Sequence, residues 1–144
     1  MAQARAAGFT LIEVMIALAI VAITTLLAAS TYRNHLRRGH RAQAAQSLLI
    51  AAAEQEKFHL ANGTYVNRLD AVAGDDPPGL PVASRTPGGH YTIAVTLATA
   101  AEFRVVATAS ASQSDPACHK MSIDESGRRL ATRADGADSA ARCW

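Results

Sequence analysis

A single carboxylate, Glu13, interrupts a long apolar stretch near the N-terminus. From Phe9 to Ala29 the sequence reads FTLIEVMIALAIVAITTLLAA, and Glu13 is its only ionisable side chain. A carboxylate inside a bilayer-length helix costs about 2.5 kcal/mol or more, so a specific partner is expected for it. The simpler interpretation is that Glu13 lies near the helix end and reaches toward the lipid headgroups.

The only two cysteines, Cys118 and Cys143, lie in the C-terminal part of the chain. Two cysteines in a small domain beyond a membrane segment suit one disulfide in an oxidising compartment. A zinc site would need more ligands at a usable spacing, so no metal is expected. Two free buried thiols are the alternative.

Residues typical of catalysis form no recognisable pattern. The histidines, at positions 35, 40, 59, 90 and 119, are scattered, and the sequence has no HExxH, phosphate-binding-loop or nucleophile-elbow motif. Cys118 and His119 are adjacent, but neighbouring residues of a strand point to opposite faces. We therefore expect no enzyme and no cofactor.

Arginines follow the apolar stretch. Arg33, Arg37 and Arg41 recur at helical spacing, with Arg38 beside them. This face can meet lipid phosphates, acidic residues of another subunit or DNA phosphates, although a solvated face is the simpler interpretation. The net charge of +2 is too small to indicate nucleic acid by itself. These arginines favour a cytoplasmic C-terminal domain, whereas a disulfide favours the opposite side of the membrane.

The helical element that would position these residues follows from sequence periodicity. Residues 9–61 contain no proline and predict one long helix that ends at Asn62-Gly63. Its second half carries a largely apolar stripe, which consists of Leu36, Ala44, Ala45, Leu48, Leu49, Ala52, Ala53 and Leu60. Residues 62–90 are rich in glycine and proline and predict an irregular connector, from which Tyr65, Val66 and Leu69 can pack against the helix.

Strand-forming runs follow the connector. Tyr91–Leu97 and Phe103–Ala109 predict a hairpin, and short strands at 121–123 and 128–131 flank a turn at 124–127. One helix followed by a run of strands predicts an α+β fold, in which an antiparallel sheet of about four strands packs on the helix. A bond between Cys118 and Cys143 would close a C-terminal loop.

Three interpretations fit the N-terminus. The apolar run exceeds the roughly 7 to 15 residues usual for a secretory signal peptide. A plain membrane anchor fits the length of the run but leaves Glu13 unexplained. In the third interpretation, residues 1–8 form a polar leader that is removed between Gly8 and Phe9.

The stretch Gly8-Phe9-Thr10-Leu11-Ile12-Glu13-Val14 resembles the leader junction of type IV pilins and the related pseudopilins. The resemblance implies that an inner-membrane prepilin peptidase cuts after Gly8 and that the new amine of Phe9 is methylated. This amine would be a cation in an apolar bundle, where Glu13 of a neighbouring subunit can neutralise it and set the register of assembly.

The resemblance also implies a division of the chain. Residues 1–8 would be the leader, 9–32 the transmembrane and assembly half of the helix, and 33–144 the globular head. The head would comprise helix 33–61, connector 62–90, and the sheet with its disulfide loop at 91–144, which is the pilin fold. The precursor would cross the bacterial inner membrane once, with a periplasmic C-terminal domain, and then join an extracellular pilus fibre.

Within this family, the short second half, the cysteine pair and the terminal Cys143-Trp144 resemble PilE-like minor pilins. The implied function is a structural subunit of a type IV pilus that supports assembly, twitching motility, adhesion or DNA uptake. Its partners would be other pilin subunits, the prepilin peptidase, the inner-membrane assembly machinery and, before assembly, membrane lipid, with DNA as a further candidate. The alternatives are a type II secretion pseudopilin and a membrane-anchored periplasmic binding domain.

Overall fold

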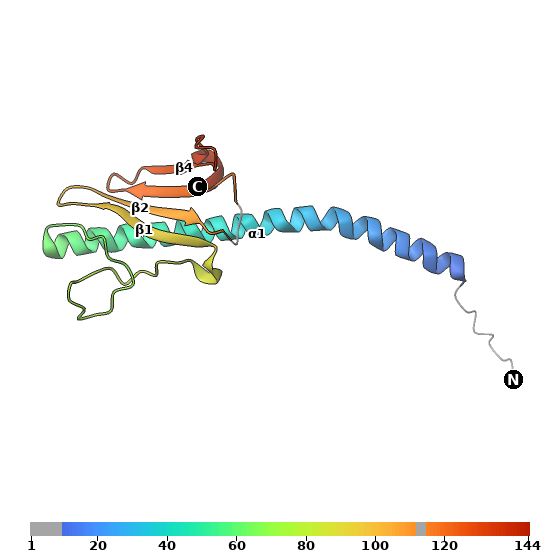
Figure 1. Ribbon diagram of the computed structural model, residues 1–144, viewed down its shortest axis with the longest axis horizontal. Helices are drawn as coiled ribbons and strands as arrows, with labels where there is room; N and C mark the ends of the chain where they lie inside the picture. The colour runs from blue at the N-terminus through green and yellow to red at the C-terminus, as the bar shows by residue number, and fades with distance from the viewer. Residues whose placement is uncertain (1–9, 112–114) are drawn as a thin grey trace. The chain divides into compact units, whose positions relative to one another are not determined.

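The computed structural model describes residues 10–111 and 115–144, with residues 26–31 described by their backbone alone. In chain order the elements are α1 (Leu11–Asn62), the 3₁₀ helix η1 (Pro87–Gly89), β1 (Tyr91–Ala98), β2 (Phe103–Ala109), β3 (Lys120–Asp124), β4 (Arg129–Thr132) and α2 (Ala140–Cys143) (Figure 1). The chain divides into two compact units, one ending at Leu36 and the other beginning at Arg37. One long helix followed by four strands confirms the predicted α+β class.

Residues next to each end of α1 explain where the helix begins and ends. The hydroxyl of Thr10 accepts a hydrogen bond from the Glu13 amide at 3.3 Å, which caps the first turn. At the other end Gly63 adopts a φ of +69°, and its amide donates to the His59 carbonyl at 2.7 Å. The helix predicted for residues 9–61 is confirmed, since its observed ends differ from the predicted ones by two residues or fewer.

In the first unit, large apolar side chains of α1 are exposed, among them Leu11 and Leu18. Within the ranges that the structure describes, no helix has the length and apolarity needed to cross a membrane. The predicted membrane segment 9–32 includes Phe9 and the side chains of 26–31, which lie outside the described residues.

The sheet has the strand order β1-β2-β3-β4, and every neighbouring pair is antiparallel. The register places Ala107 of β2 opposite Ile93 on one side and Met121 on the other, and Met121 opposite Ala131 of β4. Buried and more exposed residues alternate along β1 and β2, as expected for a sheet with one face on a core. The predicted hairpin and both shorter strands are confirmed.

The core of the second unit lies between the sheet and the C-terminal half of α1 (Figure 1). Ala44, Leu48 and Ala51 are fully buried there. From the sheet they meet Tyr91, Ile93, Phe103, Val105, Ala107, Met121, Ile123 and Ala131. The predicted apolar stripe is wrong at Leu49 and Leu60, because their side chains are 42% and 87% exposed and do not pack in the core. A sheet covers only one side of a helix, and Leu49 is rotated by about 100° from Leu48.

The connector is held to α1 by a buried amide. The Gln55 side chain donates from Nε2 to the Val66 carbonyl at 2.5 Å and accepts from the Val66 amide at 3.1 Å. As predicted, Tyr65, Val66 and Leu69 pack against the core.

Each outer strand of the sheet is bonded to a neighbouring segment. Beside β1, the Ile93 amide donates to the Ser84 carbonyl at 2.7 Å. Beside β4, the Ser139 amide donates to the Ala131 carbonyl at 3.0 Å, and the Trp144 indole N–H donates to the Leu130 carbonyl at 2.9 Å. The C-terminal segment is therefore fixed against β4.

Candidate functional site

Cys118 and Cys143 form a disulfide whose Cα atoms are 5.8 Å apart. Both side chains are buried, with Cys118 just before β3 and Cys143 at the end of α2. The bond closes a loop that contains β3, β4 and α2. The predicted disulfide is confirmed, and the alternative of two free thiols is wrong.

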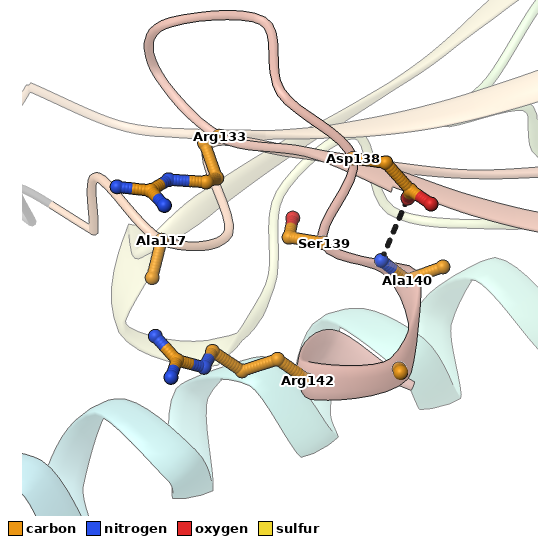
Figure 2. A pocket seen from close by; sticks show the side chains of 7 residues that line it. Ala117, Arg133, Asp138, Ser139, Ala140 and Arg142 are labelled. Atoms are coloured by element: carbon orange, nitrogen blue, oxygen red, sulfur yellow. Dashed lines mark hydrogen bonds between the residues drawn. The ribbon is translucent and has the colours of Figure 1, made fainter.

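A pocket of about 290 Å³ lies within this loop. Its lining comprises Ala117, Arg133, Asp138, Ser139, Ala140, Ala141 and Arg142. Figure 2 shows the Arg133 and Arg142 side chains extending to the same side, above and below Ala117, although Arg133 follows β4 and Arg142 belongs to α2. Asp138 lies away from both, and its Oδ1 accepts a hydrogen bond from the Ala140 amide at 3.0 Å (Figure 2).

The side chains that line the pocket carry two positive charges, on Arg133 and Arg142, and one negative charge, on Asp138. The Arg133 guanidinium lies 3.6 Å from Asp135, and the two side chains are 52% and 61% exposed, so solvent weakens their attraction. Arg142 is exposed and has no ion-pair partner among the described residues. Two guanidinium groups with little neutralisation by neighbouring carboxylates form a suitable site for an anion.

A second charged group connects α1 with the segment before Cys118. Arg41 donates from Nε to Asp115 Oδ2 at 2.7 Å and from Nη2 to Oδ1 at 2.8 Å. The two side chains are only 15% and 1% exposed. The Tyr91 hydroxyl lies 3.1 Å from Asp115 Oδ2 and 3.0 Å from the Cys118 carbonyl oxygen. This network fixes the start of the disulfide loop to the helix and to β1.

The ion pair governs the ionisation of this group. Burial opposes ionisation of Asp115, but the hydrogen bonds and charge of Arg41 prevail and hold the pKa of Asp115 below its usual range. The hydrogen bonds that Arg41 donates to Asp115 in turn raise the pKa of Arg41. Burial, followed by the charge of Asp115, raises the pKa of Tyr91, so its hydroxyl keeps its proton at neutral pH.

The structure places the arginines of the predicted face in different environments. Arg33 and Arg38 are exposed and Arg37 is half-buried, in agreement with a largely solvated face. For Arg41 that interpretation is wrong, because Asp115 supplies a partner from 74 residues further along the chain. Arg41 is therefore a structural residue.

The residues predicted for processing and assembly remain untested. Glu13 lies in the first turn of α1 with an exposed side chain. Gly8 and Phe9 lie outside the described residues, so cleavage after Gly8, methylation of Phe9 and the pairing of Glu13 stay predictions. Across 10–111 and 115–144, no three His, Cys, Asp or Glu side chains are grouped to hold a metal ion.

Sequence reasoning missed two cations on the solvent face of the sheet and the two in the pocket. Arg104 of β2 and Lys120 of β3 are exposed, and Lys120 lies opposite Thr108 and Thr132. Their positions next to apolar residues in the alternating strand sequences could have identified them. Arg133 and Arg142 belong to no periodic pattern.

Comparison with solved structures indicates the fold. A type IV pilin from Shewanella oneidensis is 25% identical, with 74% of this chain and 96% of that chain covered and a TM-score of 0.48. The non-core minor pilin PilV of Neisseria meningitidis is 14% identical, with 72% of this chain and 93% of that chain covered and a TM-score of 0.53. The likeness to PilV is one of fold, and it agrees with the predicted pilin fold.

Comparison with protein families is more specific. The model of the prokaryotic N-terminal methylation motif matches residues 3–29, which include the junction at Gly8 and Phe9. The model described as type IV minor pilin ComP, DNA uptake sequence receptor, matches residues 30–122, which include the second half of α1 with β1 and β2. This chain therefore belongs to the family of the type IV minor pilin ComP.

Proposed function

We propose that this minor pilin is a receptor for DNA that is taken up through a type IV pilus. The observation that carries the proposal is the match over residues 30–122 to a family described as a DNA uptake sequence receptor. A pilin is a structural subunit, in agreement with the prediction that the chain is not an enzyme. Of the roles that the resemblance to pilins implied, DNA uptake is the one this match favours.

Surface cations support the proposal. Arg104 and Lys120 face solvent from adjacent strands, where they can contact phosphate oxygens. Arg33 and Arg38 are also exposed. Arg41 is excluded from this role because it is bound to Asp115. Since the net charge is only +2, binding would depend on a few local contacts and not on the field of the whole protein.

The subunit would enter the fibre as other pilins do, from a processed precursor in the inner membrane. The methylation motif at residues 3–29 supports an inner-membrane precursor that is cut after Gly8 and methylated on Phe9. Residues 9–32 would serve as its membrane and assembly segment, and residues 33–144 as its periplasmic head. In the fibre, the Phe9 amine of one subunit would pair with Glu13 of the next. Its partners would then be other pilin subunits, the prepilin peptidase and the inner-membrane assembly machinery.

Direct binding tests the receptor role. The full chain, purified in detergent, is titrated with fluorescent duplexes made from genomic DNA of the producing bacterium and with random duplexes of equal length and composition. A receptor binds both pools through phosphate contacts, and repeated selection enriches a common sequence from the genomic pool. Failure to bind either pool in about 50 mM salt, where such contacts are strong, would refute the proposal.

Processing and pairing need separate tests in cells. Mass spectrometry of sheared pili should find subunits that begin at a methylated Phe9. Glu13→Leu should leave the precursor in the membrane while lowering its amount in the fibre, because the Phe9 amine would lack its counter-charge. Normal incorporation of that variant would overturn the pairing of Glu13 with Phe9.

A further inference from the structure

We infer that the pocket containing Arg133 and Arg142 binds one phosphodiester group of the DNA backbone. This inference rests on the proposed receptor function and adds a residue-level contact to it. The family match ends at residue 122, so the match assigns no role to these two arginines. Their role is inferred from the geometry and charge of the pocket alone.

The fold holds the pocket in place. On one side, the Ser139 amide donates to the Ala131 carbonyl at 3.0 Å, and the Arg133 amide donates to the Ala137 carbonyl at 2.8 Å. On the other side, Arg142 is adjacent to Cys143, whose disulfide reaches the residue after Ala117. The backbones that carry the two guanidinium groups are therefore fixed relative to each other before any ligand arrives, which reduces the entropy cost of binding.

The charge of the pocket favours an anion. Figure 2 shows both guanidinium groups on the same side of the pocket, with the Asp138 carboxylate away from them. The contact of Arg133 with Asp135, at 3.6 Å between exposed side chains, is weak enough for a ligand to replace. Arg142 has no carboxylate partner in the described part of the chain. An incoming anion therefore meets two available cations, with Asp135 as a weak competitor and Asp138 as a lining carboxylate that lies away from them.

The donors and the size of the pocket suit a phosphodiester. A guanidinium presents its N–H donors as a planar fork that matches two oxygens of a phosphate. Ser139 lines the same pocket, with its hydroxyl oxygen 3.4 Å from Cys143 Sγ. The pocket volume of about 290 Å³ is larger than a phosphate group, so the backbone on either side of the bound phosphate can continue out of the pocket. Such a contact positions DNA without reading its sequence.

The test measures how affinity depends on salt. The full chain in detergent is titrated with two fluorescent 20-base-pair duplexes of unrelated sequence, at several salt concentrations. Arg133→Gln and Arg142→Gln should each weaken binding by about tenfold. Each should also reduce the salt slope, which is the steepness of log affinity against log salt concentration, by about 1, and the double variant should reduce this slope by about 2. Because phosphate contacts carry no sequence information, the losses should be equal for both duplexes.

Two further variants make the test specific. Arg85→Gln removes the same charge from an exposed arginine of the connector and should leave the salt slope unchanged. Asp135→Asn removes the competitor of Arg133 and should tighten binding by a factor of about two to five. Asp135→Asn also keeps both arginines, so it gives a result even where an arginine variant is poorly folded.

The outcomes separate the two proposals. Wild-type protein that binds neither duplex would refute the receptor function and this inference with it. Wild-type binding combined with unchanged salt slopes in Arg133→Gln and Arg142→Gln and unchanged affinity in Asp135→Asn would overturn the phosphate site alone. Losses that differ strongly between the two duplexes would also overturn it, because they would indicate base recognition and not a backbone contact.

Discussion

Arg41 and Asp115 are 74 residues apart in the sequence, yet two hydrogen bonds of 2.7 and 2.8 Å join their side chains. Asp115 also accepts a hydrogen bond from the Cys118 amide at 3.3 Å. The position of Cys118, and with it the start of the disulfide loop, therefore depends on a residue of α1. Breaking this pair should affect more than one element.

Removing the carboxylate from the pair should be costly. Asp115→Asn should lower the free energy of unfolding by about 3 kcal/mol, because the largely buried Arg41 charge loses its partner. Denaturant unfolding of the full chain at neutral pH measures the change. Glu54→Gln is the matched control, since it removes a carboxylate from the more exposed Lys57 pair at 3.3 Å, and it should cost less than about 0.5 kcal/mol. Equal costs would contradict a stabilising role for the Arg41 pair.

The same carboxylate predicts how stability depends on pH. The pKa of Asp115 is lowered in the folded protein, so its contribution is complete above the unfolded pKa of about 3.9. Between the two pKa values the unfolded chain binds more protons, and stability falls as pH falls. From about pH 5 to about pH 2.5, wild type should lose more unfolding free energy than Asp115→Asn. Parallel curves from urea unfolding would contradict this prediction.

Two glycine-to-alanine changes should have opposite effects. A Cβ on Gly39, inside α1, would meet no atom within 4 Å, and alanine should stabilise the helix by about 1 kcal/mol. A Cβ on Gly79 would lie 2.8 Å from the Ala71 Cβ and 3.0 Å from the Arg68 carbonyl oxygen. Gly79→Ala should therefore destabilise by about 1 to 3 kcal/mol. Thermal unfolding gives both signs, and a stabilising Gly79→Ala would show that the connector adjusts freely.

Loss of the disulfide should be visible in the fluorescence of Trp144, the only tryptophan. The indole donates to the Leu130 carbonyl, and the Arg129 guanidinium lies 5.3 Å from its ring centre. Replacing both cysteines by serine should cost about 3 kcal/mol and shift the emission to longer wavelength as the indole enters water. Dithiothreitol should act on wild type and leave the double variant unchanged. An unshifted emission would mean that the Trp144 contacts hold without the disulfide.

Elements that depend on neighbouring residues could be predicted from the sequence. The absence of proline from 11 to 62 and the glycine at 63 determine the extent of α1. Alternating side chains locate β1 and β2, and two cysteines allow only one intramolecular pairing. These signals are local or unique, so they need no knowledge of the tertiary structure.

Contacts between distant segments could not be predicted in the same way. Asp115 stands between two strands beside Pro116, and nothing near it in the sequence assigns it to Arg41. Arg133 and Arg142 line one pocket only because the chain turns back after β4 and bonds to that strand. The predicted stripe also extended too far, to Leu60, because periodicity does not show which part of a helix the sheet covers.

The two edges of the sheet are bonded to neighbouring segments through Ser84, Ser139 and Trp144. This affects how the head behaves among its own copies. Unpaired strand edges invite other chains to add strands, which is a common route to aggregation. Here the connector and the C-terminal segment occupy positions that an intruding strand would need. At these positions a strand of a neighbouring head therefore finds backbone groups that are already paired.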